Sequence, residues 1–322
     1  MKKTIISGLA VGLALLFVIS TAYPWNYATH AYIAGKIGKI PLLANFNEMY
    51  GIMLPDFLNT KFDYVFDGTL RGYTHGVPVG HPYFPPSTDF MKVWQKAKFG
   101  LKKNIAFGYV AHNDVWGADY VAHWNADPYD QTQGQEPGFI ILLAQVLNSN
   151  IDWTPFEQLG LSLSDSDKLE FCHNIVEYAG DILIKKADPW IGNKLFMAAV
   201  LRTPETTNLL KAAYPLEYHD LINSAEPEFR RQMALLGITL MKPPEAIISF
   251  FAEELAGLSI EYFKALYGQD ISAYKDLLIL FGKGAIGTSV GLCEALGYMD
   301  EVNMTVQWVA EQLAGHLVIY SF

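Results

Sequence analysis

The 322-residue sequence has little charge, almost no cysteine and few basic residues. Charged residues make up 17% of the chain, below the usual share of about 25%. Hydrophobic residues make up 51%, which is ample for a packed core and excludes a disordered or fibrous protein. Acidic side chains outnumber basic ones by 33 to 23, for a net charge of -10. Duplex nucleic acid is therefore a poor partner, because phosphate contacts need Lys and Arg.

The sequence also lacks a disulfide framework and strand-like patterns. Two cysteines, Cys172 and Cys293, can form at most one bridge, or both can stay buried and reduced. Alternating runs of Val, Ile and Thr are scarce, and there is no internal repeat, low-complexity tract or linker. These absences predict an all-α fold in one helical domain over residues 23–322.

The N-terminus has the features of an export signal. Lys2 and Lys3 precede an uncharged apolar stretch, and small residues at Ser20 and Ala22 fit a cleavage site after Ala22. We expect a signal peptide over residues 1–22 and a secreted or periplasmic protein, the alternative being an uncleaved anchor helix. No second segment is long and apolar enough to span a membrane convincingly.

Helical patterns dominate the remaining chain. Residues 55–87, rich in Gly, Pro and aromatics, are expected to form a long ordered loop. Its aromatic side chains could line a substrate cleft that holds a quaternary ammonium group by cation–π contacts, or simply pack the loop; they are Phe62, Tyr64, Phe66, Tyr73, Tyr83 and Phe84. The expected helices are Thr29–Gly38 with Thr29 as a candidate cap, most of Phe90–Trp124, Phe139–Leu147, Ser164–Ile184, one opened by Pro244, and further helices over residues 190–322.

The segment from His112 to His123 carries three residues of metal-ligand type. Asp119 and His123 are four residues apart, so they lie one turn apart on one helix face. His112 precedes Asp119 by seven residues and returns to that face within about 20°. This spacing predicts one helix that carries all three, with Asp114 pointing away from them, either to orient a ligand or to meet solvent.

A second pair, His173 and Glu177, has the same four-residue spacing on an otherwise apolar helix. A buried histidine and glutamate need partners, and imidazole nitrogen with carboxylate oxygen suits zinc. One such pair is usually a surface ion pair, but two pairs with a third histidine in phase favour a metal site. His219 and His316 are interpreted as surface or core residues.

Ordered landmarks in the sequence resemble a known family. The chain is similar to the zinc-dependent phospholipase C family, which is related in fold to single-strand-specific zinc nucleases and to the catalytic domain of glycosylphosphatidylinositol-specific phospholipase D. The landmarks span about residues 25–180; they are Trp25 followed by Thr29-His30, then Pro55-Asp56, Tyr73-Thr74-His75, Gly108 to His123, and His173 with Glu177.

The resemblance implies a multi-helix bundle with three zinc positions, occupied by two or three ions. Asp56, His75, His112 and Asp119 would hold the first ion, and Asp119 would bridge to a second approached by Trp25 and His30. His123, His173 and Glu177 would hold the third. The family places an Asp four residues after the first helix histidine, where this chain has Trp116; a bulge near Gly117 would bring Asp119 into place. His81 competes with His75 for its role.

The resemblance also implies an activity. We expect a zinc-dependent hydrolase of phosphoric esters, with a phospholipid or another phosphodiester as substrate and peripheral contact with a membrane surface. Asp119 would bridge the metals and Asp56 would orient the attacking water. Two alternatives stay open: a zinc-dependent nuclease, and a non-catalytic, metal-stabilised helical protein that binds lipid or a partner.

Overall fold

The computed structural model describes residues 26–38, 43–58, 67–130, 136–158, 161, 163–316 and 318. The expected signal peptide and Trp25 lie outside these residues.

The fold is an all-α multi-helix bundle, as the sequence predicts. No strand occurs in the described ranges, where the one isolated bridge pairs Val77 with Ser87. The helices of the first half are α2 (Tyr27–Ile37), α3 (Leu43–Met53), η2 (Leu54–Leu58), α4 (Gly68–Thr74), α5 (Met91–Lys96), α6 (Leu101–His112), η3 (Tyr120–Trp124), α7 (Phe139–Asn150) and α8 (Thr154–Gln158).

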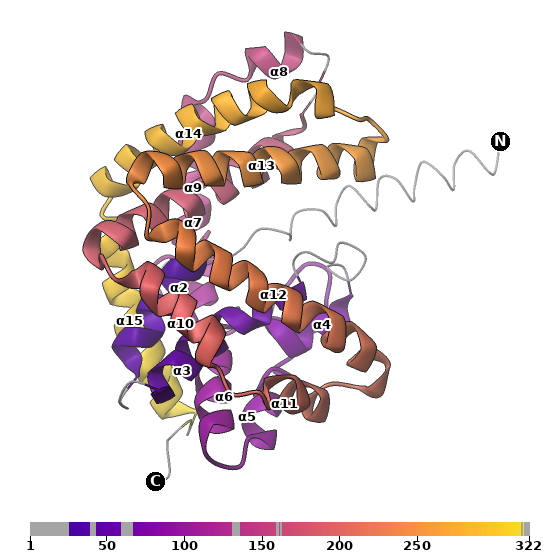
Figure 1. Cartoon of the computed structure of the whole chain (residues 1–322), viewed down its shortest axis with the longest axis vertical. Helices are drawn as coiled ribbons and strands as arrows, with labels where there is room; N and C mark the ends of the chain where they lie inside the picture. The colour runs from indigo at the N-terminus through magenta and orange to yellow at the C-terminus, as the bar shows by residue number, and fades with distance from the viewer. Residues whose placement is uncertain are drawn as a thin grey trace, which may run out of the picture.

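The second half continues as longer helices. In Figure 1, α9, α13 and α14 lie side by side at one end of the molecule, and α12 runs from α13 toward α11. α10 packs against α12 and α3, while α2 contacts α3, α9 and α15. These helices are α9 (Asp165–Ala187), α10 (Ile191–Leu201), α11 (Thr206–Ala213), η4 (Leu216–Tyr218), α12 (His219–Leu240), α13 (Pro244–Tyr267), η5 (Ser272–Tyr274), α14 (Lys275–Ala295) and α15 (Tyr298–Gly315).

Two glycines allow α3 and α6 to cross closely. A Cβ on Gly108 would lie 2.0 Å from the carbonyl oxygen of Glu48, and one on Gly51 would lie 2.1 Å from that of Ile105. Larger side chains at either position would push the helices apart. The close crossing fixes the end of α6, where His112 is the last helical residue.

Local sequence signals explain several helix ends. Of Ser164 and Asp165, the two cap candidates that the sequence offers for α9, the structure has Ser164, which forms a reciprocal capping box with Asp167. Pro244 opens α13 at its first position, as predicted. The cap of α2 is Asn26 and not Thr29. Thr29 lies inside the helix, and its hydroxyl bonds Asp181 on α9 and Tyr298 on α15.

The prediction of a continuous loop over residues 55–87 is wrong within the described part. Asp67 accepts hydrogen bonds from the backbone N–H groups of Thr69 and Leu70, and this cap starts α4. Of the loop aromatics, Tyr73 packs against Tyr214, Phe84 stacks on His81, and Tyr83 is exposed. Phe62, Tyr64 and Phe66 lie outside the described residues.

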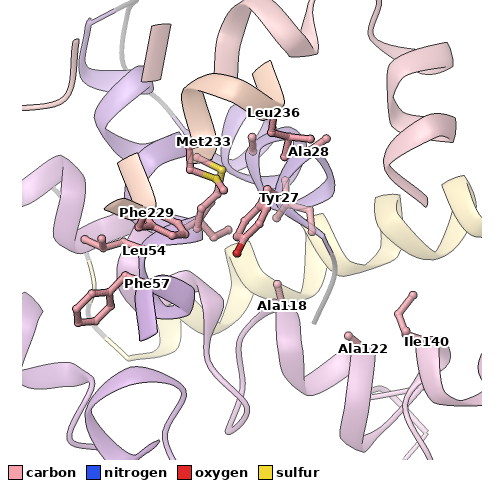
Figure 2. Packing of buried hydrophobic residues seen from close by; sticks show 14 of the residues in the cluster. Tyr27, Ala28, Leu54, Phe57, Ala118, Ala122, Ile140, Phe229, Met233 and Leu236 are labelled. Atoms are coloured by element: carbon pink, nitrogen blue, oxygen red, sulfur yellow. The ribbon is translucent and has the colours of Figure 1, made fainter. Parts of the chain in front are cut away.

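Buried apolar side chains from several helices form one core, part of which is drawn in Figure 2. Phe57 is adjacent in sequence to Asp56, Ala118 to Asp119, and Ala122 to His123, and all three apolar side chains are buried. Because packed cores have little free volume, these neighbours restrict where the adjacent polar side chains can go. Other core members drawn in Figure 2 are Tyr27, Ala28, Leu54, Ile140, Phe229, Met233 and Leu236.

Two further expectations are resolved. Cys172 and Cys293 are both buried and free, and burial raises the pKa of each thiol to about 12. Contrary to the expectation of no second apolar span, Ser272–Ala295 is long and apolar enough to cross a membrane by length and composition. That is weak grounds for a span, because part of this segment packs against α13 and α9.

Candidate metal centre

Eight of the nine expected ligand residues lie close together, and they come from six segments of the chain. The ninth, Trp25, lies outside the described residues. α2 supplies His30, η2 supplies Asp56, and His75 follows the last residue of α4. The remaining five are His112 at the end of α6, Asp119 and His123 at η3, and His173 and Glu177 on α9.

The first group consists of Asp56, His75 and His112. The Nε2 atoms of His75 and His112 lie 3.1 and 3.6 Å from Oδ1 of Asp56. One ligand atom from each of the three residues lies within 4.8 Å of the other two. All three residues are buried, so water is not available to solvate these atoms freely.

Asp119 lies between this group and His30. Its Oδ1 is 2.9 Å from Nε2 of His30, and its Oδ2 is 2.8 Å from Nε2 of His112. The imidazoles of His30 and His112 are stacked, with ring centroids 4.4 Å apart. One carboxylate thus directs a different oxygen toward each of two histidines, which is the arrangement a bridging ligand needs.

The last group joins η3 to α9. The rings of His123 and His173 meet edge to face with centroids 5.2 Å apart, and Nε2 of His173 lies 3.0 Å from Oε1 of Glu177. One ligand atom from each residue again lies within 4.8 Å of the others. The expected approach of α9 to His123 is therefore present.

The prediction that His112, Asp119 and His123 share one helix is wrong. α6 ends at His112, a turn covers residues 113–117, and Asp119 with His123 belongs to the following η3 segment, a short π-helix. Oδ1 of Asn113 accepts hydrogen bonds from the backbone N–H groups of residues 115–117 and stabilises this turn. The break is thus larger than the expected bulge.

Gly117 is required in this turn. A Cβ at this position would lie 2.5 Å from the carbonyl oxygen of His112. Asp119 reaches His112 because the chain folds back over the end of α6, and not because of helical phase.

Asp114 does not point away from the cluster, in contrast to the helical-phase interpretation. It is fully buried; its Oδ1 lies 3.3 Å from Nδ1 of His123, and its Oδ2 accepts a 2.6 Å hydrogen bond from Arg71. Its backbone N–H donates to the carbonyl of His75. Although burial disfavours its charge, Arg71 and His123 hold the pKa of Asp114 well below its usual range. The carboxylate therefore stays ionised and orients His123.

Burial sets the protonation of the histidines. It lowers the pKa of His75, His112 and His123 to about 4, so that all three are neutral near pH 7. Neutral imidazole is the form that binds a metal ion. At Glu177 burial raises the pKa to about 8; at His173 burial favours the neutral imidazole, but Glu177 and Glu170 outweigh it and raise the pKa. Both groups therefore hold their protons more firmly than usual, and a metal ion that binds them would have to displace protons.

Several ligand atoms are buried without a hydrogen-bond partner among the described residues. They include Nε2 of His123, Oδ2 of Asp119 and Oε1 of Glu177. Nε2 of His112 and of His173 are in the same condition, although each lies within 3.0 Å of a carboxylate oxygen. Such orphaned polar atoms are costly and rare. Cations bound within the separate groups would satisfy these atoms, so the residues present could hold metal ions.

His81 occupies a different position from His75. Its Nδ1 accepts hydrogen bonds from the backbone N–H groups of Tyr83 and Phe84, which places its hydrogen on Nε2. His75 is the histidine grouped with Asp56 and His112. His316 is exposed and stacks on Trp116, and His219 is partly buried near the Tyr214 carbonyl, in line with their interpretation as surface or core residues.

Arg71 was not among the residues predicted for the site, yet its guanidinium pairs with Asp114 beside His123. A signal was present, because Arg71 precedes His75 by four residues and so shares its helix face.

Comparisons of this chain with protein-family models, with curated proteins and with solved structures found no match.

Proposed function

We propose that this protein is a zinc-dependent hydrolase of phosphoric ester bonds, exported through its N-terminal signal. The observation that carries the proposal is the convergence of buried imidazole and carboxylate atoms to within 4.8 Å of one another in several groups. Some of these atoms, such as Nε2 of His123, have no hydrogen-bond partner among the described residues. Nitrogen and oxygen ligands without thiolates are typical of catalytic zinc, whereas purely structural zinc usually has cysteine ligands. The ordered resemblance to the zinc-dependent phospholipase C family supports the same activity.

The clustered residues would bind zinc in separate groups. Asp56, His75 and His112 would hold one ion, His30 a second, and Asp119 would bridge them through its two oxygens. His123, His173 and Glu177 would hold a third. When bound, neighbouring zinc ions neutralise phosphoryl oxygens and lower the pKa of a bound water.

The protein's own groups would then orient the reactants. Asp56, near both His75 and His112, is the carboxylate that we assign to orienting the attacking water. Asp114 fixes the ring of His123, and its pair with Arg71 keeps it ionised. No protein nucleophile is needed.

We propose a phospholipid or another phosphodiester as substrate, in preference to nucleic acid. The net charge of -10 disfavours binding to a polyanion. The same acidity disfavours tight docking on anionic membranes, so contact with a membrane surface would be peripheral and would favour zwitterionic lipid.

The test is hydrolysis of bis(p-nitrophenyl) phosphate and of phosphatidylcholine in mixed micelles. Protein as purified, protein treated exhaustively with a chelator, and protein reconstituted with zinc are compared. We expect chelation to abolish hydrolysis and zinc to restore it, with magnesium as the control that does not. Activity that survives chelation would remove the metal from the mechanism. Zinc-loaded protein that is inactive on both substrates and on single-stranded nucleic acid would favour the metal-stabilised binding protein.

A further inference from the structure

Arg71 lies at the edge of the candidate metal centre. It is in the last turn of α4, and the backbone N–H of His75 bonds the carbonyl of Arg71. Residues four apart on a helix lie one above the other. Arg71 and His75 therefore project from the same face of α4, the face turned toward the clustered ligands.

Asp114 fixes the guanidinium in this place. One terminal nitrogen of Arg71 lies 2.6 Å from Oδ2 of Asp114, whose Oδ1 is turned toward Nδ1 of His123. Ligand atoms of Asp114, Asp119 and His123 all lie within 4.8 Å of one another. Among the ion pairs of the described residues, this one alone joins an arginine or lysine to a carboxylate of the cluster.

The guanidinium keeps unused hydrogen-bonding capacity. In the described part of the chain its hydrogen-bond partner is Asp114, and its Nε is buried without one. The side chain is 14% exposed, whereas those of Asp114, Asp119 and His112 are fully buried. Arg71 is thus a partly exposed charged donor next to fully buried carboxylates.

Arg202 shows what a purely structural arginine looks like in this fold. Its guanidinium bonds the carboxylate of Glu226 through Nη2 and the carbonyl of Thr203 through Nη1, and its Nε lies 2.7 Å from a Glu226 oxygen. Two of its nitrogens donate hydrogen bonds, and its Nε faces Glu226 as an ion pair although it makes no hydrogen bond. At Arg71 the described residues provide one acceptor, which leaves the rest of the planar fork for a ligand.

The charge of Arg71 acts on the surrounding site. Alongside burial, it contributes to the lowered pKa values of His75, His81 and His123, so its field covers the centre and the adjoining loop. His81 stacks on Phe84, and its ring centroid is 5.4 Å from that of Trp124, the residue after His123. The charge of Arg71 therefore acts on a group of uncharged rings made by His81, Phe84 and Trp124.

We propose that Arg71 is an anion-binding residue whose guanidinium takes non-bridging oxygens of the substrate's phosphoryl group next to the metal centre. A planar fork of N–H donors matches a tetrahedral oxyanion, and the positive charge offsets the carboxylates of the cluster. This inference rests on the proposed function, because it names what the site recognises.

The test is binding of inorganic phosphate to zinc-loaded protein by isothermal titration calorimetry, with zinc content measured in the same samples. Arg71→Gln alone would leave Asp114 buried and unpaired, so the informative variant is the double change Arg71→Gln with Asp114→Asn. Asp114→Asn alone retains the arginine and reports the cost of losing the tether. Arg231→Gln, at an exposed arginine of α12, controls for the change in net charge.

We expect the double variant to bind phosphate about 10- to 100-fold more weakly than Asp114→Asn, the range for losing a charged hydrogen bond. Arg231→Gln should bind as the wild type does. Arg71→Lys, which retains the charge but not the fork, should fall between. In hydrolysis assays the loss should appear mainly as a higher KM.

Equal phosphate affinity in the double variant and in Asp114→Asn would overturn the inference and leave Arg71 as a tether for Asp114. The proposed function fails separately, when zinc-loaded wild-type protein hydrolyses no phosphoric ester. Weaker phosphate binding in the double variant would uphold anion recognition even in that case.

Discussion

Two buried clusters of charged residues in this molecule differ in how their polar atoms are satisfied. Between α3, α10 and α12, the carboxylate of Glu226 accepts hydrogen bonds from Tyr50, Thr207 and Arg202. Burial and the nearby Glu226 carboxylate raise the pKa of Tyr50, so its hydroxyl remains a donor. In this cluster each charge faces an opposite charge within the protein, although Nε of Arg202, 2.7 Å from Oε1 of Glu226, makes no hydrogen bond. We call this cluster closed.

The candidate metal centre is equally buried but is left open. Oδ2 of Asp119, Oε1 of Glu177 and Nε2 of His123 make no hydrogen bond among the described residues. The two oxygens each lie within 3.0 Å of an imidazole nitrogen, and carboxylates and imidazoles converge there without an arginine or lysine at the centre of either group. The closed cluster stabilises the fold, whereas the open one leaves free energy available for a bound cation. Burial alone does not distinguish the two clusters. The way in which their charged groups are paired does, and it marks the first as structural and the second as a candidate binding site.

The largest effect is expected from Asp119→Asn, which removes the charge at the centre of the candidate metal site. Asparagine retains the shape but loses the charge that faces both His30 and His112. Loss of a residue that only hydrogen-bonds a metal ligand costs about 10- to 100-fold in metal affinity or activity. We expect loss of the bridging carboxylate, which would bind the metal itself, to exceed that range. Zinc content and phosphodiester hydrolysis measure it. Full activity with full zinc content would show that Asp119 bridges nothing.

Glu226→Gln should have the opposite profile. It leaves the buried guanidinium of Arg202 without its counter-charge, and breaking a buried pair costs about 3–5 kcal/mol of stability. Urea denaturation measures this loss. Zinc content and activity per folded molecule should match those of the wild type; a specific loss of zinc would mean that the two clusters are not independent.

Asp181 is an intermediate case: this buried carboxylate accepts hydrogen bonds but has no ion pair with a basic side chain among the described residues. It accepts from the backbone N–H groups of Ala28 and Thr29 and from the Thr29 hydroxyl. Burial raises its pKa from 3.8 to about 7, so its contribution to stability is fully present below pH 3.8 and is lost as pH rises through 7. We expect the wild type to lose about 2–4 kcal/mol over this window, at roughly 1.4 kcal/mol for each pKa unit.

The matched variant is Asp181→Asn, which cannot ionise. The free energy of unfolding, measured by denaturant titration across the same pH range, should fall less steeply in the variant. An identical pH dependence in the two proteins would show that the fold does not raise the pKa of Asp181, because the ionised carboxylate would then be as stable in the folded protein as in the unfolded chain.

The smallest effect is expected from Asp114→Asn, which weakens one ligand's support without removing a ligand. His123 would lose its charged partner, and zinc at the His123–His173–Glu177 group should bind about 10- to 100-fold more weakly. Competition titration with a zinc chelator measures it. If Asp114→Asn proves more damaging than Asp119→Asn, Asp114 itself is a ligand.

Local sequence signals predicted the parts of this molecule that depend on near neighbours. The helix start near Ser164, the proline at the start of α13, and the pairing of His173 with Glu177 all arise within one helical turn. The all-α fold also follows from the scarcity of alternating patterns.

The parts that depend on side chain–backbone competition were not predictable in this way. Helical phase suggested a continuous helix through Asp119, but the side chain of Asn113 binds three backbone N–H groups and ends α6. The same phase argument placed Asp114 away from the site. The short α4 was missed because its Gly- and aromatic-rich sequence resembles a loop, although Asp67 caps it.

The most direct test of the account is a zinc count by elemental analysis on folded, reconstituted protein after extensive dialysis. The open cluster predicts two or three ions per chain in the wild type, in line with its groups of convergent ligands. It also predicts the same count in Glu226→Gln and a lower count in Asp119→Asn. A wild-type protein that retains no zinc, or an Asp119→Asn variant that retains the full count, would contradict the claim that these unsatisfied atoms form a metal centre.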